Sequence, residues 1–207
     1  MVLPPGCSAE LAAALEAARA ADAVIRPLFR SNLAVEFKAD RSPVTEADRR
    51  AEQAIREVLA ARFPDYAFFG EESGRHGAEG RPLWLVDPLD GTKSFVRDTP
   101  FFSTQIALLR DGELVLGVSS ACACDELACA EKGRGAFLNG RPIRVSAVDR
   151  LDAAILSTGN LKSLAASPQW ADFGALVGRV NRLRGYGDFV HYHLLARGAL
   201  DLVVESD

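Results

Sequence analysis

The sequence lacks a long apolar run and a basic leader, and it is poor in cysteine and histidine. About 20 consecutive apolar residues are needed to cross a bilayer, and no such run is present. Residues 1–6 lack the basic start and the apolar stretch of a secretory signal peptide. The formal net charge of the 207 residues is −4, which argues against a nucleic-acid partner because such proteins usually have a basic face. We therefore expect a cytoplasmic protein with no membrane or nucleic-acid partner.

The few soft metal ligands do not form a recognisable metal motif. The four cysteines are Cys7, Cys122, Cys124 and Cys129. They are too few for a disulfide scaffold and contain no CxxC pair, so we expect small buried residues beside a strand. His191 and His193 are expected to be a partly buried structural pair, because residues i and i+2 of a helix face different directions.

The composition is that of an ordinary globular protein, with 48% hydrophobic and 25% charged residues. The first two thirds indicate two amphipathic helices and a mostly antiparallel sheet, and the remainder alternates strands with helices. We predict an α/β (α+β) fold with lobes at residues 1–145 and 146–207. Hairpin turns are expected at 111–112 and 139–140, and a flexible loop at 74–82. The expected helices are 9–30, 45–63, 169–180 and 188–196, and the expected strands are 66–69, 83–86, 104–109, 113–118, 154–157, 182–184 and 200–204.

The strongest chemical signal is the segment WLVDPLDGTKSF at residues 84–95. An apolar strand is expected to end at Asp87, and Pro88 to force a turn that brings Asp90 back beside it. Two carboxylates that close repel each other by about 4 kcal/mol at an effective dielectric constant of 20. Such a pair is either partly protonated or bound to cations, and oxygen-only ligands favour Mg²⁺ over zinc. Gly91 and Thr92 then open a helix, whose N–H groups suit a phosphate.

A second acidic motif, Gly70-Glu71-Glu72-Ser73, follows a neighbouring strand. If Glu71 reaches Asp87 and Asp90, three carboxylates and a peptide carbonyl could hold two ions, clamp a phosphoryl group and activate a water. The alternative is that the two aspartates only form a turn and that the glutamates are solvated loop acids.

Four segments of the chain resemble the motifs of the inositol monophosphatase family. They are residues 38–48, which end in SPVTEAD, 70–73 (GEES), 87–95 (DPLDGTKSF) and 133–140 (GRGAFLNG). They occur in the family's order and spacing, which argues strongly against the turn-only interpretation. The resemblance implies a layered αβαβα sandwich, Mg²⁺-dependent hydrolysis of a small phosphate monoester, and a homodimer.

The resemblance also implies roles for individual residues. The metal ligands would be the carboxylates of Glu71, Asp87 and Asp90 and the backbone carbonyl of Leu89. They would hold two or three Mg²⁺ ions, for which Mn²⁺ may substitute. Glu71 and Thr92 would orient the attacking water, which would displace the alcohol in line without a phosphoenzyme. The N–H groups of Gly91 and Thr92 would bind the phosphate.

Two acids near these ligands have less certain roles. Asp48 matches an acid that lies beside a weaker third ion in the family, so it is a candidate catalytic residue. The alternative is that Asp48 only caps a helix, because Thr45-Glu46-Ala47-Asp48 is a capping pattern. Glu72 is expected to lie beside the ligands without touching the ions.

The chain departs from the family pattern at its C-terminal end. The family has another metal-ligand Asp several residues beyond the position of Glu205, whereas the sequence ends at Asp207. We expect a truncated sequence, because a domain that ended on an apolar strand would leave its last layer uncovered. The alternative is a short variant with a damaged second metal site.

The substrate is indicated by Gly187, Asp188 and Glu205, which match positions that border the substrate's alcohol in the family. Asp188 resembles the histidinol-phosphate phosphatases of the family more than the simple inositol phosphatases, which have a small apolar residue there. Histidinol phosphate carries an ammonium and an imidazole, and a carboxylate can pair with either. The alternative is that Asp188 caps the following helix.

The favoured function is therefore hydrolysis of histidinol phosphate or inositol monophosphate. A non-catalytic metal- or phosphate-binding family member is one alternative, suggested by the missing C-terminal acid. A phosphatase for 3′-phosphoadenosine 5′-phosphate is another, although the sequence shows no basic cluster for it.

Overall fold

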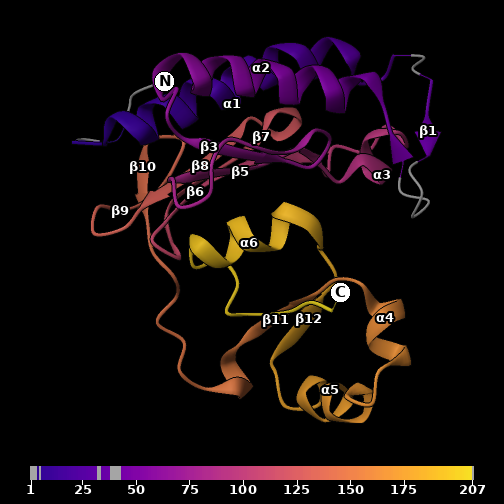
Figure 1. Cartoon of the computed structure of the whole chain (residues 1–207). Helices are drawn as coiled ribbons and strands as arrows, with labels where there is room; N and C mark the ends of the chain where they lie inside the picture. The colour runs from indigo at the N-terminus through magenta and orange to yellow at the C-terminus, as the bar shows by residue number, and fades with distance from the viewer. Residues whose placement is uncertain (1–3, 5, 32–33, 38–42, 207) are drawn as a thin grey trace. The chain divides into compact units, whose positions relative to one another are not determined.

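The computed structural model describes residues 4, 6–31, 34–37 and 43–206 (Figure 1). The chain divides into two compact units, Met1–Pro142 and Ile143–Asp207. The sequence pattern predicts lobes at residues 1–145 and 146–207. Residues 38–42 of the first family motif lie outside the described part of the chain.

Two long helices, α1 (Ala9–Leu28) and α2 (Glu46–Arg62), belong to the first unit. Ser8 caps α1 by accepting a hydrogen bond from a backbone N–H of its first turn. Thr45 and Asp48 form a reciprocal capping box at the start of α2. The capping pattern expected at Thr45–Asp48 is therefore confirmed.

The first unit is built on an eight-stranded sheet with the order β10-β9-β8-β7-β6-β5-β3-β4. β3 and β5 are parallel, whereas β3–β4 and the successive pairs from β5 to β9 are antiparallel. The strands are β3 (Ala67–Gly70), β4 (Gly74–His76), β5 (Leu83–Asp90), β6 (Ser103–Arg110), β7 (Glu113–Ala121), β8 (Glu126–Glu131), β9 (Gly135–Leu138) and β10 (Arg141–Ile143). Shorter elements are β1 (Glu36–Phe37), β2 (Pro43–Val44), α3 (Thr92–Phe95) and the 3₁₀ turn η1 (Cys122–Cys124).

The two hairpin turns that the sequence predicts are confirmed. Asp111 and Gly112 join β6 to β7 with positive φ angles of 52° and 79°. Asn139 and Gly140 join β9 to β10 with φ angles of 50° and 75°. This left-handed backbone suits the twist of a two-residue hairpin, and Asn, Asp and Gly adopt it most readily.

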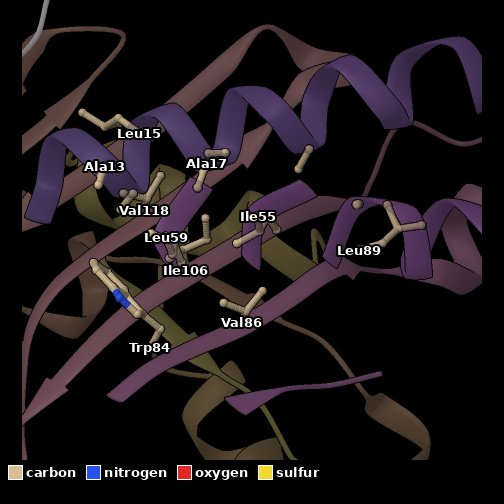
Figure 2. Close-up of a cluster of buried hydrophobic side chains, with 14 of the residues drawn as sticks. Ala13, Leu15, Ala17, Ile55, Leu59, Trp84, Val86, Leu89, Ile106 and Val118 are labelled. Carbon is tan, nitrogen blue, oxygen red and sulfur yellow. The ribbon is translucent and has the colours of Figure 1, made fainter. Parts of the chain in front are cut away.

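The helices α1 and α2 lie side by side over the sheet and bury their apolar faces against it (Figure 1). Figure 2 shows this core, in which apolar side chains of both helices meet those of the central strands. The labelled residues are Ala13, Leu15, Ala17, Ile55, Leu59, Trp84, Val86, Leu89, Ile106 and Val118. Leu89, which lies between Asp87 and Asp90, belongs to this core, so the core supports the acidic segment directly.

Two expectations for the sheet are wrong. The predicted loop at 74–82 contains β4, which pairs antiparallel with β3. Strand β5 does not end in a turn at Asp87 but continues to Asp90, with a shift of register between these two residues. Pro88 has no N–H to give to the ladder, so it produces an irregularity within the strand.

The cysteines only partly follow the expectation of burial. Cys122 and Cys129 are buried, and burial raises the pKa of their thiols to about 12 and about 11 respectively. Cys124 is exposed, contrary to the expectation, because the turn η1 holds it outside the core.

The second unit contains a three-stranded parallel sheet with the order β12-β11-β13. Its strands are β11 (Ile155–Thr158), β12 (Arg182–Arg184) and β13 (Leu202–Val204), and its helices are α4 (Leu161–Ala166), α5 (Trp170–Val177) and α6 (Asp188–Ala196), with a 3₁₀ turn η2 (Leu151–Ala153). The expected parallel pairing is confirmed, and α6 and β12 have the expected bounds. Helix α4 was not expected.

Candidate active site

The structure brings the three predicted carboxylates together at one end of β3 and β5. Gly70 is paired with Val86 in the parallel ladder, and the Glu71 N–H donates to the Val86 carbonyl at 3.1 Å. Glu71 and Asp87 therefore follow matched positions on neighbouring strands. Because parallel strands end at the same edge of a sheet, both acids emerge at this edge.

The irregularity in β5 brings Asp90 to the same place. Asp87 is paired with Gln105 of β6, and Asp90 is paired with Ser103. The Asp87 carboxylate accepts a hydrogen bond from the Leu89 N–H at 3.0 Å, which fixes the backbone between the two acids. Leu89 itself is fully buried, so its side chain anchors the acidic segment in the core.

The electrostatics of this cluster are unfavourable without a cation. Burial and the nearby charges of Glu71 and Asp90 raise the pKa of Asp87 to about 8, and a hydrogen bond with Glu71 adds to the shift. A hydrogen bond between two carboxyl groups needs a shared proton. With a pKa of about 8, the Asp87 carboxyl keeps its proton at neutral pH, when an ordinary aspartate would be ionised.

This donor set fits hard divalent cations. Within the part of the chain that the structure describes, no three His, Cys, Asp or Glu side chains are placed as a complete set of metal ligands. The acids instead interact with one another, through the charges of Glu71 and Asp90 and a hydrogen bond between Glu71 and Asp87. Carboxylate and carbonyl oxygens are the ligands that Mg²⁺ prefers, and a positive ion would offset both the burial of the Asp87 carboxylate and its repulsion by Glu71 and Asp90.

The segment after Asp90 forms the start of a short helix, as the sequence predicts. Gly91 precedes α3 with a φ of 89°, and a Cβ at this position would lie 2.6 Å from the Phe101 carbonyl oxygen. Only glycine fits this close approach in this conformation. Thr92 is the first residue of α3, so its backbone N–H lies at the helix start.

The structure connects Thr92 directly to Asp48. The Thr92 hydroxyl lies 3.0 Å from Asp48 Oδ1 and 3.0 Å from the Leu89 carbonyl oxygen. The other oxygen of Asp48 accepts hydrogen bonds from the N–H and the hydroxyl of Thr45, at 2.8 and 2.7 Å. Burial raises the pKa of Asp48, although these hydrogen bonds oppose the shift. Asp48 therefore caps α2 and also contacts the segment that carries Thr92.

The substrate residues predicted in the second unit lie at the ends of α6 and β13. Gly187 is the N-cap residue of α6, with no side-chain cap hydrogen bond, and Asp188 is the first helical residue. The interpretation of Asp188 as the helix cap is therefore wrong, because the cap position belongs to Gly187. The exposed Asp188 has a φ of 46°.

Glu205 follows β13 and packs closely against other residues of this unit. A Glu205 oxygen lies 3.4 Å from His191 Nε2, and a Cβ at Gly159 would lie 2.1 Å from the same oxygen. His191 and His193 are buried, as expected for a structural pair. The contact of His191 with Glu205 was not expected, because a lone histidine on a helix gives no sign of its partner on a distant strand.

Sequence reasoning also missed Glu52. This carboxylate is buried on α2 and accepts hydrogen bonds from the backbone of residues 72 and 73. The sequence places Glu52 four residues after Asp48 and therefore on the same face of the helix, but this spacing alone does not distinguish a buried acid from a solvated one.

The comparisons with known proteins identify the family. Residues 8–207 match the profile of the inositol monophosphatase family. The chain is 38% identical over 198 residues to a histidinol-phosphatase of Chlorobaculum parvum, and the match covers 95% of this chain and 76% of that protein. It is 46% identical over 129 residues to an inositol-1-monophosphatase of Rhizobium meliloti, which covers 62% of this chain and 48% of that protein.

A solved structure agrees with this assignment. The extragenic suppressor protein suhB of Bartonella henselae superposes with a TM-score of 0.87 at 32% identity, over 97% of this chain and 79% of that one. The chain belongs to the inositol monophosphatase family. The resemblance inferred from the four motifs and the mixed α/β fold class are thus confirmed. Among the described residues, no helix has the length and apolar character to cross a bilayer.

Proposed function

We propose that this chain hydrolyses a small phosphate monoester with the help of divalent cations held by Glu71, Asp87, Asp90 and the backbone carbonyl of Leu89. The observation that carries the proposal is the convergence of three carboxylates, in which burial and then the nearby charges of Glu71 and Asp90 raise the pKa of Asp87 to about 8. Mg²⁺ is the favoured ion and Mn²⁺ a substitute, because both accept oxygen ligands. We infer two or three such ions.

When bound, the cations would neutralise charge on the phosphoryl oxygens and lower the pKa of the attacking water. The residues of the chain supply the orientation. The Thr92 hydroxyl is held by oxygens of Asp48 and Leu89, so it donates its proton there and can accept a hydrogen bond from a water. Glu71 would accept the second hydrogen of that water. Asp48 thus acts through Thr92 in this proposal, whether or not it also binds a third ion.

The phosphate would be held at the start of α3. The N–H groups of Gly91 and Thr92 lie at the point where a helix begins and where the backbone is unobstructed by a side chain at residue 91. Such N–H groups favour anions. In-line attack by the oriented water would then release the alcohol without a covalent intermediate on the protein.

Histidinol phosphate is the substrate that we favour. Asp188 is exposed in the first turn of α6, where its carboxylate could pair with a cationic group of the substrate. Glu205 offers a second carboxylate in the same unit, with its side chain 25% exposed. From the family resemblance, both residues and Gly187 would border the alcohol part of the substrate. Inositol monophosphate is the second candidate, because Glu205 could equally accept hydrogen bonds from hydroxyl groups.

Phosphate release is the decisive assay. The purified protein should be incubated with histidinol phosphate, inositol 1-phosphate and 3′-phosphoadenosine 5′-phosphate, with Mg²⁺ and with EDTA. We expect Mg²⁺-dependent release, fastest from histidinol phosphate, and loss of about three orders of magnitude in kcat for Asp90→Asn. A non-catalytic family member would release phosphate from none of them, and would bind Mg²⁺ or phosphate without turnover. A homodimer and a cytoplasmic location also remain part of the proposal.

A further inference from the structure

Glu52 is a buried carboxylate that none of the roles above explains. It lies on α2 and is only 4% exposed. One of its oxygens accepts the Glu72 N–H at 2.7 Å, and the other accepts the Ser73 N–H at 2.8 Å. A carboxylate on a helix thus satisfies two successive backbone N–H groups of the segment that directly follows Glu71.

Gly70, which precedes Glu71, also lies against the Glu52 carboxylate. A Cβ added to Gly70 would lie 2.4 Å from the Glu52 carboxyl carbon and 2.4 Å from one of its oxygens. Real side chains never approach so closely, so residue 70 must be glycine while Glu52 keeps its place. The backbone on both sides of Glu71 is therefore in contact with the same buried carboxylate.

The same face of α2 also supports the other half of the candidate site. Asp48 and Glu52 are four residues apart and lie one above the other on the helix. Asp48 contacts Thr92, and Glu52 contacts the backbone around Glu71. Thr92 and Glu71, the two residues proposed to orient the attacking water, follow different strands. Carboxylates of the same helix, α2, nevertheless contact Thr92 and the backbone next to Glu71.

We propose that Glu52 is a positioning residue, which fixes the backbone of residues 70–73 so that the Glu71 carboxylate lies beside Asp87. This inference rests on the proposed function for the role of Glu71 as a metal ligand. Two hydrogen bonds from N–H groups to an ionised carboxylate are strong and geometrically specific. An amide side chain cannot replace them, because its NH₂ group would face one of the two N–H donors.

The test compares Glu52→Gln with the matched control Glu57→Gln. Glu57 is an exposed carboxylate on the same helix, and it accepts a hydrogen bond from the Gln53 side chain. Amide hydrogen exchange should accelerate at residues 72 and 73 in Glu52→Gln and not in Glu57→Gln. Calorimetric titration with Mg²⁺ should show affinity weakened about 10–100-fold in Glu52→Gln alone, the usual loss when a group that orients a metal ligand is removed.

A second pair of variants guards against simple misfolding. Gly70→Ala should displace the Glu52 carboxylate and weaken Mg²⁺ binding in the same way. In the Glu52→Ala background there is room for the added methyl group, so Gly70→Ala should lower the Mg²⁺ affinity little further. Such non-additivity is the sign of two residues that act through one contact.

The outcomes separate this inference from the proposed function. Unchanged exchange at residues 72 and 73 in Glu52→Gln would overturn the positioning role, whatever the chain binds. Faster exchange with unchanged Mg²⁺ affinity would overturn it as well, because Glu52 would then support only the fold. A wild-type chain that binds no Mg²⁺ and releases no phosphate would overturn the proposed function, and the exchange rates would still decide whether Glu52 holds the segment.

Discussion

Replacing Asp87 by asparagine should stabilise the metal-free protein while it abolishes metal-dependent stabilisation. In the folded chain the pKa of Asp87 is raised from 3.8 to about 8, with burial as the largest cause and the charges of Glu71 and Asp90 next. A raised carboxyl pKa means that the folded state holds a proton that the unfolded state releases. The free energy of unfolding should therefore fall as pH rises from about 4 to about 8, and stay constant below that window.

The size of this effect can be bounded. Each unit of pKa shift corresponds to about 1.4 kcal/mol, which gives an upper limit of about 4 kcal/mol at pH 7. Asp87 is only half-buried and water screens part of the repulsion. We expect Asp87→Asn to gain about 1–2 kcal/mol over the wild type at pH 7 in EDTA, and nothing at pH 4.

Urea unfolding in EDTA at several pH values measures this difference, with Asp65→Asn as the control. Asp65 is an exposed aspartate of the same unit, and its substitution should change little. Saturating Mg²⁺ should reverse the order, because the wild type gains binding free energy and Asp87→Asn does not. The reasoning would be refuted if Asp87→Asn were less stable than the wild type in EDTA at pH 8, or if its difference did not depend on pH.

Three further predictions concern single contacts. Thr92→Val removes the hydroxyl that lies 3.0 Å from Asp48 and should lower kcat by about 100-fold or more in the phosphate-release assay. Thr92→Ser keeps a hydroxyl and should retain most of the activity. Equal rates for the two variants would exclude the proposed role of the Thr92 hydroxyl. Gly159→Ala places a methyl group where the Glu205 carboxylate lies, so the KM for histidinol phosphate should rise with little change in kcat, and an unchanged KM would remove Glu205 from the substrate site. Leu59→Ala leaves a cavity between α2 and the sheet and should lower the free energy of unfolding by about 2–5 kcal/mol in urea titrations. A loss below about 1 kcal/mol would contradict the core described above.

The sequence was sufficient for the elements that depend on local patterns. The helix cap at Thr45, the Asp-Gly hairpin at 111–112 and the bounds of α6 all follow from residues within one turn or one hairpin. The convergence of the three carboxylates was left open by the sequence, which places Glu71 and Asp87 after short apolar segments but does not show that these two strands are parallel. Parallel strands then bring the acids to one edge.

Other features depend on partners that are distant in sequence. Strand β4 lies in a glycine-rich charged segment and forms because β3 offers it a free edge. The continuation of β5 past Pro88 depends on pairing of Asp90 with β6. Glu52 is a polar residue on an amphipathic helix, and only the structure shows that it turns inward to the backbone of residues 72–73. Local periodicity cannot distinguish such a buried acid from a solvated one.

The central claim is that the carboxylates of Glu71, Asp87 and Asp90 hold divalent cations. A crystal grown with Mn²⁺, measured at a wavelength where manganese scatters anomalously, tests this claim directly. The account predicts anomalous peaks with ligand distances of about 2.1–2.2 Å to these three side chains and to the Leu89 carbonyl oxygen. Anomalous peaks elsewhere, or carboxylates that turn away from one another with no ion between them, would contradict it.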